Sequence, residues 1–179
     1  KQMGEVPLLT REREVEISKR IEEAENEVKR IIYSFGFTGK EHIALAEKLI
    51  SEPPKERFDR VIVDKKIESR ERHLKSLRRL VRDVRAIDHK VDQKYISLLK
   101  AKNKSALTRA EKVFGQNNQK LQKSFPKFFY KQKVIEEMSI VADNVHEKIG
   151  VSLEAIEKAS KRKTAANEQI IDGESRKLK

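Results

Sequence analysis

The stretch KKIESRERHLKSLRRLVRDVRAIDHKVDQKYISLLKAKN, residues 65–103, contains neither glycine nor proline. Two series of residues recur in it every seven positions: Ile67, Leu74, Val81, Asp88 and Tyr95, and Leu77, Val84, Val91 and Leu98. This period predicts one long amphipathic helix with a coiled-coil stripe, which the charged Asp88 interrupts. At 1.5 Å per residue the helix would extend roughly 55 Å, so its stripe needs a long partner to cover it.

The expected partner lies downstream of this stretch. Apolar residues at helical spacing predict a second helix, with Leu107, Ala110, Phe114 and Leu121 on its inner face. Phe125-Pro126 then predicts a break before a third apolar series: Val134, Met138, Val141, Val145 and Ile149. We expect Gly150 to close that helix and Ser152 to cap another. The fold class is therefore all-α, an elongated helical bundle with a long antiparallel helical hairpin.

Upstream of the long stretch, two capped helices are predicted. Thr10 can cap a helix that begins at Arg11 and ends at Gly36. Its apolar positions form one stripe: Ile17, Ile21, Ala24, Val28, Ile31 and Phe35. Residues 38–41 match a capping box for a second helix that ends before Pro53-Pro54. Its inward positions are Ile43, Ala46, Leu49 and Ile50, and a further short helix is expected around Phe58 and Val61.

Composition and motifs exclude several classes of function. Charged residues make up 39% of the 179 residues and aromatic residues 6%, which suits exposed helices and not a Rossmann or barrel enzyme. There is no cysteine, so we expect a reducing, cytosolic setting without disulfides or thiolate metal sites. No apolar run approaches the about 20 residues that a membrane-spanning helix needs.

Catalytic signatures are also missing from the sequence. None of the glycines lies in a nucleotide-binding pattern. The four histidines have no metal-ligand spacing, and we expect all of them at the surface: His42, His73, His89 and His146. The sequence therefore predicts no enzyme activity and no cofactor.

The net charge of +12 is concentrated in the middle of the chain. Residues 1–69 have a net charge of −1, residues 70–133 of +14, and residues 134–179 of −1. Such an excess either binds a polyanion through phosphate contacts or forms a solvated helix face. Beside the heptad stripe runs a basic docking ridge of four arginines, which either grips phosphate or pairs with an acidic partner: Arg78, Arg79, Arg82 and Arg85.

An aromatic segment interleaved with lysine, FPKFFYK at residues 125–131, allows two interpretations. Its rings either stack on unpaired bases or fill the end of the bundle, and the second interpretation is favoured. An RNA-binding hairpin would need Arg78, Arg82 and Phe128 on one surface.

Residues 3–22, MGEVPLLTREREVEISKRIE, resemble region 1.2 of the primary, housekeeping sigma factors of bacterial RNA polymerase. Arg13 and Ser18 depart from the family's usual glycine and alanine, and both fit a helix. In the family, residues just upstream of the Met-Gly pair help to hold the non-template promoter strand. The resemblance thereby implies DNA contacts for the start of the chain, at Lys1, Gln2, Met3 and Arg11.

The other end, IIDGESRK at residues 170–177, looks like the approach to region 2.1 of the same family. The resemblance implies a region 1.2-like helix with its leader at residues 1–36, a helical non-conserved insertion at 37–150, and a helix leading into region 2.1 at 151–179. Both ends would continue in a longer factor.

By resemblance, the chain is part of a transcription initiation factor that directs core RNA polymerase to promoters and assists melting, in the bacterial cytoplasm. Its expected partners are RNA polymerase core, promoter DNA and a transcription regulator, without a membrane. The alternative is a helical scaffold whose basic face binds nucleic acid or an acidic partner.

Overall fold

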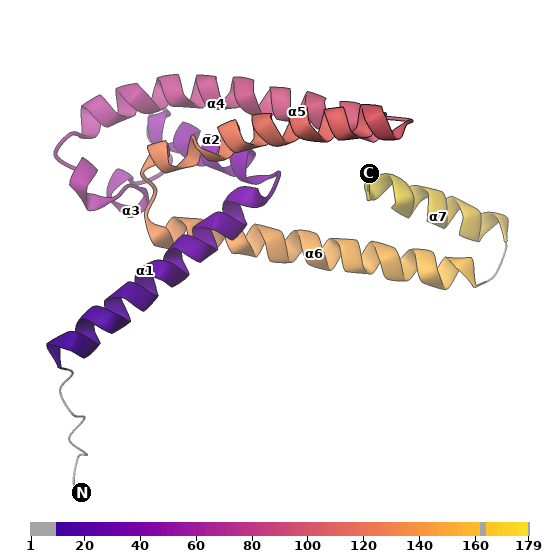
Figure 1. The fold of residues 1–179 in the computed structure, drawn as a ribbon, viewed down its shortest axis with the longest axis horizontal. Helices are drawn as coiled ribbons and strands as arrows, with labels where there is room; N and C mark the ends of the chain where they lie inside the picture. The colour runs from indigo at the N-terminus through magenta and orange to yellow at the C-terminus, as the bar shows by residue number, and fades with distance from the viewer. Residues whose placement is uncertain (1–9, 162–163, 179) are drawn as a thin grey trace, which may run out of the picture. The chain divides into compact units, whose positions relative to one another are not determined.

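The computed structural model describes residues 10–161 and 164–178, and these residues are almost entirely helical (Figure 1). The α-helices are α1 (Arg11–Ser34), α2 (Thr38–Ile50), α3 (Phe58–Val61), α4 (Arg70–Leu99), α5 (Lys104–Gln122), α6 (Gln132–Ser160) and α7 (Ala165–Lys177). Two 3₁₀ helices are η1 (Asp64–Lys66) and η2 (Phe125–Phe128). Within the described residues, β pairing is limited to one antiparallel bridge between Ile62 and Tyr130. The predicted all-α class is confirmed.

The chain divides into two compact units, Lys1–Ile135 and Glu136–Lys179. The first unit contains α1 to α5 and the first turn of α6, and the second contains the rest of α6 and α7. The long α4–α5 hairpin belongs to the first unit, which also contains most of the buried apolar side chains.

Helix α4 forms the hairpin with α5, as predicted, and the two lie side by side (Figure 1). It begins at Arg70, later than the predicted 65, because residues 64–66 form the 3₁₀ turn η1. Asn103 starts α5, since its side-chain oxygen accepts a hydrogen bond of 2.8 Å from the Ala106 backbone N–H. Four apolar residues of the predicted heptad stripe are buried: Leu77, Val81, Val84 and Val91.

Helix α2 also packs on α4, and the polar Asp88 lies at their contact. Its carboxylate is 3.2 Å from Nζ of Lys40, in the first turn of α2. A Cβ atom added at Gly39 would lie 2.7 Å from Asp88 Oδ1, so the two helices approach closely at this glycine. The charged interruption of the heptad stripe is therefore the position where a third helix joins the hairpin.

The predicted capping box at the start of α2 is wrong. The N-cap residue is Phe37, which makes no side-chain capping bond. The Thr38 hydroxyl instead donates a hydrogen bond of 2.5 Å to the Ile32 carbonyl. Thr38 is fully buried, so its hydroxyl connects the end of α1 to the start of α2.

The segment around η2 fastens the hairpin to the short α3 region. The Val63 backbone N–H donates to the Phe129 carbonyl at 2.9 Å, and the Lys131 N–H donates to the Val61 carbonyl at 2.8 Å. Phe129 has φ 58°, in the left-handed region, which turns the chain sharply between η2 and the Tyr130 bridge. Phe128 and Tyr130 thereby point into the core on either side of Phe129.

The second unit corrects one expectation. Helix α6 runs through Gly150 and Ser152 to Ser160, so Gly150 does not close a helix and Ser152 does not cap one. A single glycine costs about 1 kcal/mol in a helix interior, which the flanking helix formers can offset. Ser152 is buried and donates a hydrogen bond of 2.8 Å to the Glu174 carboxylate of α7. Thr164 caps α7 by accepting from the Asn167 N–H at 3.3 Å.

Candidate nucleic-acid interface

The amino end of α1 is capped as predicted. The Thr10 hydroxyl accepts a hydrogen bond of 3.4 Å from the Arg13 N–H, and the helix begins at Arg11. Arg11 and Arg13 are both exposed in the first turn. Three of the four residues predicted to contact DNA lie outside the described residues, namely Lys1, Gln2 and Met3. Arg11 is therefore the one of the four that the structure places.

The predicted apolar stripe of α1 is largely uncovered. Ile21 is 55% exposed and Ile31 44% exposed, and Ile17 and Phe35 are also exposed. The buried residue of this helix is Ile32, next to the stripe, near the junction with α2. Helix α1 thus joins the core through its last turns only, and most of its length presents both charge and apolar surface.

The predicted basic ridge on α4 separates into two pairs of arginines. Arg78 forms an ion pair of 3.1 Å with Glu52, and Arg85 pairs with Glu47 of α2. Both arginines lie on the side of α4 that faces α2. Arg79 and Arg82 form no ion pair with these two carboxylates, and Arg82 instead has an ion pair of 3.9 Å with its neighbour Asp83. The four residues therefore do not act as one uniform surface.

The outward face of α4 carries a longer row of cations, which we name the basic stripe. Helical spacing places its members on the side of α4 opposite the buried Leu77 and Val84, and all of them are exposed: Arg72, Lys75, Arg79, Arg82 and Lys90. From Arg72 to Lys90 the stripe extends about 27 Å at 1.5 Å per residue. Such a row of exposed cations can contact several phosphates of one polyanion.

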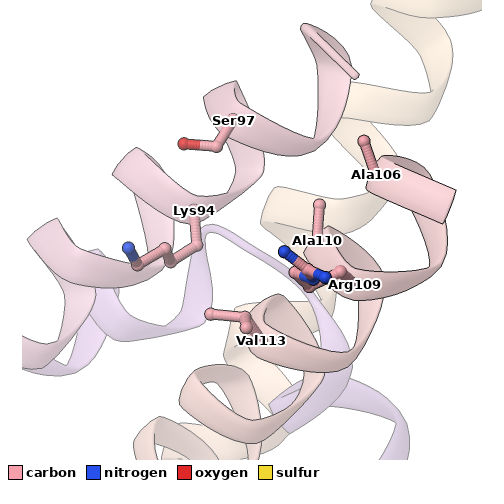
Figure 2. Close-up of a pocket in the computed structure, with 6 residues that line it drawn as sticks. All are labelled: Lys94, Ser97, Ala106, Arg109, Ala110 and Val113. Carbon is pink, nitrogen blue, oxygen red and sulfur yellow. The ribbon is translucent and has the colours of Figure 1, made fainter. Parts of the chain in front are cut away.

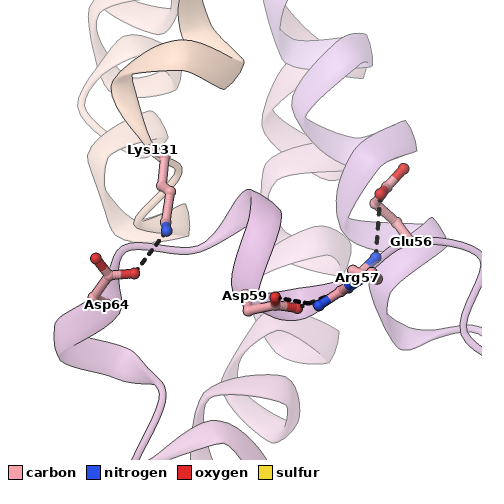
Figure 3. A network of polar contacts seen from close by, with 5 residues as sticks. All are labelled: Glu56, Arg57, Asp59, Asp64 and Lys131. Carbon is pink, nitrogen blue, oxygen red and sulfur yellow. Dashed lines mark hydrogen bonds and ion pairs between the residues drawn. The ribbon is translucent and has the colours of Figure 1, made fainter.

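Three cations near α3 and η2 are neutralised or covered locally. Arg57 donates to Asp59 at 2.7 Å, and Lys131 donates to Asp64 at 2.6 Å (Figure 3). Nζ of Lys66 lies 4.2 Å from the centroid of the Phe129 ring. The positive charge near α3 and η2 is thus less available to a partner than the charge on α4.

The aromatic segment of residues 125–131 fills the core, as the favoured interpretation predicted. Phe125 and Phe128 are 2% and 0% exposed, and Tyr130 is buried with them. The Tyr130 hydroxyl donates a hydrogen bond of 2.7 Å to the His42 carbonyl. Burial raises the pKa of the Tyr130 hydroxyl. An RNA-binding hairpin loses its main support, because Phe128 is not on the surface that Arg82 occupies.

Two histidines expected at the surface are buried, which corrects the prediction. His42 is enclosed by four aromatic rings, and its ring stacks on Phe125 with a centroid distance of 4.6 Å. Its Nδ1–H donates to the Thr38 carbonyl at 2.9 Å, while its buried Nε2 has no partner. Burial lowers the pKa of His42 from 6.5 to about 4. His73 donates to the Phe128 carbonyl at 3.2 Å, and burial lowers its pKa also.

One feature of the sequence indicated that these histidines are buried. His42 lies one helical turn before the inward Ala46, and His73 lies one helical turn before Leu77, so the spacing places both on an inward face. Their neighbours Glu41, Arg72 and Lys75 are charged, which suggested surface positions.

Neither a metal site nor a membrane-spanning helix occurs among the described residues. They contain no group of three or more histidine or acidic side chains arranged to hold a metal ion. None of their helices combines the length and the apolar character that crossing a bilayer requires.

Comparison with known proteins relates the amino end of the chain to one family. Residues 1–27 match the family model "Sigma-70 factor, region 1.2". The matched part includes Thr10, which caps α1, and the part of α1 from Arg11 to Glu27. No solved structure matches the chain. The match supports a sigma-70 family protein and, with it, a role in transcription.

Proposed function

We propose that this chain is part of a primary sigma factor. Residues 1–36 would form region 1.2, residues 37–150 the helical non-conserved insertion, and residues 151–179 the approach to region 2.1. The observation that carries the proposal is the family match over residues 1–27, which coincides with the capped, exposed start of α1. The whole factor would direct core RNA polymerase to promoters and assist melting.

The start of α1 is proposed to contact promoter DNA below the −10 element, together with Lys1, Gln2 and Met3. Arg11 and Arg13 are exposed at the positive end of the helix dipole, where an anion is favoured. Their side chains supply charge-assisted hydrogen bonds to phosphate. These contacts position DNA and do not by themselves read its sequence.

The basic stripe on α4 is proposed as a second, sequence-independent contact with duplex DNA. Its exposed arginines and lysines do not pair with Glu47 or Glu52, as Arg85 and Arg78 do, and Arg82 pairs with its neighbour Asp83 at 3.9 Å. Binding through such a stripe releases counterions, so it weakens steeply as salt rises. We therefore expect weak, salt-sensitive binding by this chain and no promoter specificity.

Electrophoretic mobility shift across salt concentrations tests both contacts. The double variant R79A/R82A should lower the affinity for a 30-base-pair duplex and reduce the salt slope by about 1 to 2. R11A should also weaken binding, with a reduction in slope of up to about 1. The matched control R78A/R85A removes the same charge from the same helix, but from the arginines that pair with Glu52 and Glu47 on the side facing α2, and should change binding less.

Two results would contradict this account. A strong preference for a promoter duplex over a scrambled one would show base reading, which contacts with phosphate alone do not provide. Equal losses in R79A/R82A and R78A/R85A would show that net charge alone matters and that the basic stripe is not a site.

A pull-down with core RNA polymerase separates the proposal from its alternative. The exposed apolar stripe of α1 favours some protein contact, which a helical interaction module unrelated to transcription would also make. Retention of core polymerase by this chain, lost when Ile21 is replaced by Asp, is the result that the sigma-factor proposal expects. Absence of any retention would favour the alternative.

A further inference from the structure

The end of the α4–α5 hairpin has a chemistry that differs from the basic stripe. We define the hairpin tip as residues 93–110, which contain five lysines or arginines and no aspartate or glutamate. The tip also exposes large apolar side chains: Leu99 is 65% exposed and Ile96 is 49% exposed. Phosphate gains nothing from such side chains, whereas a protein interface buries them.

A small groove lies between the two helices at this end (Figure 2). Lys94 and Ser97 line it from α4, and the remaining side chains come from α5: Ala106, Arg109, Ala110 and Val113. Its volume is about 260 Å³. The small alanine side chains leave this hollow, and hollows between helices receive the anchoring apolar side chains of partner proteins.

Two cations stand at the rim of this groove. Lys94 and Arg109 are both exposed, and among the described residues neither has an ion-pair partner. The nearest acidic residues along the chain are Asp92, which pairs with Lys40 at 3.0 Å, and Glu111. The groove therefore combines an apolar floor with uncompensated positive charge on both helices.

We infer that the hairpin tip docks an acidic amphipathic helix of a partner protein. One apolar side chain of that helix would enter the groove, and its flanking carboxylates would meet Lys94 and Arg109. A second copy of this chain is a poor occupant, because it carries the same net charge of +12 and the same cationic tip. A duplex satisfies the cations but leaves the apolar floor and Leu99 uncovered.

Fluorescence anisotropy with a defined probe tests this inference on the full 179-residue chain. The probe is a labelled 15-residue helical peptide with leucines along one face and glutamates beside them. A matched peptide carries glutamine in place of glutamate. We expect the chain to bind the glutamate peptide about tenfold more tightly than the glutamine peptide.

Three variants locate the binding. A106F should fill the groove from an exposed position and weaken peptide binding about tenfold, while the helical circular dichroism stays unchanged. The charge reversal K94E/R109E should weaken it at least as much. The matched reversal K112E/K120E alters two exposed lysines of α5, outside the groove and outside the basic stripe, and should leave peptide binding close to that of the unaltered chain.

The inference is overturned by three outcomes. The first is equal weakening in K94E/R109E and K112E/K120E, which would show that the effect depends on net charge alone. The second is peptide binding that A106F does not change. In the third, the chain binds a 30-base-pair duplex or phosphatidylglycerol vesicles, and A106F weakens that binding as much as it weakens peptide binding. The groove would then bind another class of partner.

Discussion

Helices α1 and α2 follow each other along the chain, and they differ in how much of their apolar surface is covered. In α2, Ile43, Ala46 and Leu49 are all less than 10% exposed against the hairpin. In α1, which is longer, Ile32 is the buried residue and the apolar stripe faces outward. A helix with a well-formed apolar stripe can thus be either a core element or an exposed surface, and its neighbours decide which.

The contrast has a local cause. Helix α2 lies along α4, where Gly39 allows close approach and Asp88 meets Lys40 at 3.2 Å. Helix α1 meets the core only near Ile32, where the Thr38 hydroxyl joins the two helices. The exposed stripe of α1 is then free for the contacts that a sigma-factor role would require.

The largest effect is expected when one aliphatic side chain is shortened in each of these two helices. Leu49→Ala should lower the free energy of unfolding of the first unit by about 3 kcal/mol, because it leaves a cavity in the core. Ile21→Ala should change it by less than about 0.5 kcal/mol, because its side chain is 55% exposed. Urea unfolding followed by tyrosine fluorescence measures both, since Tyr33, Tyr95 and Tyr130 all lie in the first unit. Equal losses would mean that α1 is covered in solution.

The next test uses pH, because α2 contributes the buried His42. Its pKa is lowered from 6.5 to about 4 by burial, so the folded state favours the neutral ring. The stability that depends on the neutral ring is complete above pH 6.5 and is lost as the pH falls toward 4. Between pH 7.5 and pH 5 we expect a loss of about 2 kcal/mol.

His42→Phe is the matched control for this pH dependence. Phenylalanine keeps an aromatic ring beside Phe125 and does not titrate. The variant should retain only the smaller acid sensitivity of other groups such as His73, whose pKa burial also lowers. An unchanged pH profile in the variant would remove His42 as the cause.

A third test examines the close approach of α2 to α4. Gly39→Ala would place its Cβ 2.7 Å from Asp88 Oδ1, and moving that buried carboxylate disturbs its pairing with Lys40. We expect destabilisation of about 1 kcal/mol, despite the better helix propensity of alanine. Gly115→Ala in α5 has nothing within 4 Å of the added atom and should stabilise by up to about 1 kcal/mol. The same urea titration measures the free energy of unfolding of both variants. A change of the same sign in both would contradict the close packing of α2 on α4 at Gly39.

The smallest effect on global stability is expected at the start of α1. Thr10→Ala removes the cap that accepts from the Arg13 N–H at 3.4 Å and should cost about 1 kcal/mol of local helix stability. Because α1 joins the core only near Ile32, the loss should appear as fraying of its first turns. Hydrogen exchange of residues 13–16 should accelerate in the variant, while exchange in α2 stays constant. Equal acceleration in both helices would show that α1 is coupled to the core along its length.

Periodicity, capping and breaking residues predicted most of the helices. The heptad stripe of residues 65–103 predicted α4, and Phe125-Pro126 predicted the interruption at η2. Thr10 predicted the start of α1, because a cap acts within a few residues of its own position. The α4–α5 hairpin was predictable because a long apolar stripe requires a partner and the downstream segment offered one.

Local patterns failed where a side chain bonds to a group on another helix. Gly150 and Ser152 suggested a helix boundary, but α6 continues through both, and Ser152 bonds to Glu174 of α7. Thr38 and Glu41 matched a capping box, but the Thr38 hydroxyl is used by the Ile32 carbonyl. In each case a tertiary contact supplied a hydrogen bond that the local pattern did not include.

The amino-acid sequence by itself determined the helical class, the cap of α1, the concentration of positive charge in residues 70–133 and the likeness of the amino end to sigma region 1.2. The tertiary structure alone decided which stripes are covered, which arginines are ion-paired and which histidines are buried. The physical reason is the separation along the chain over which each interaction acts. Propensity and capping act over a few residues, whereas burial and ion pairing depend on residues such as Glu47 and Arg85, which are brought together only when α2 packs on α4.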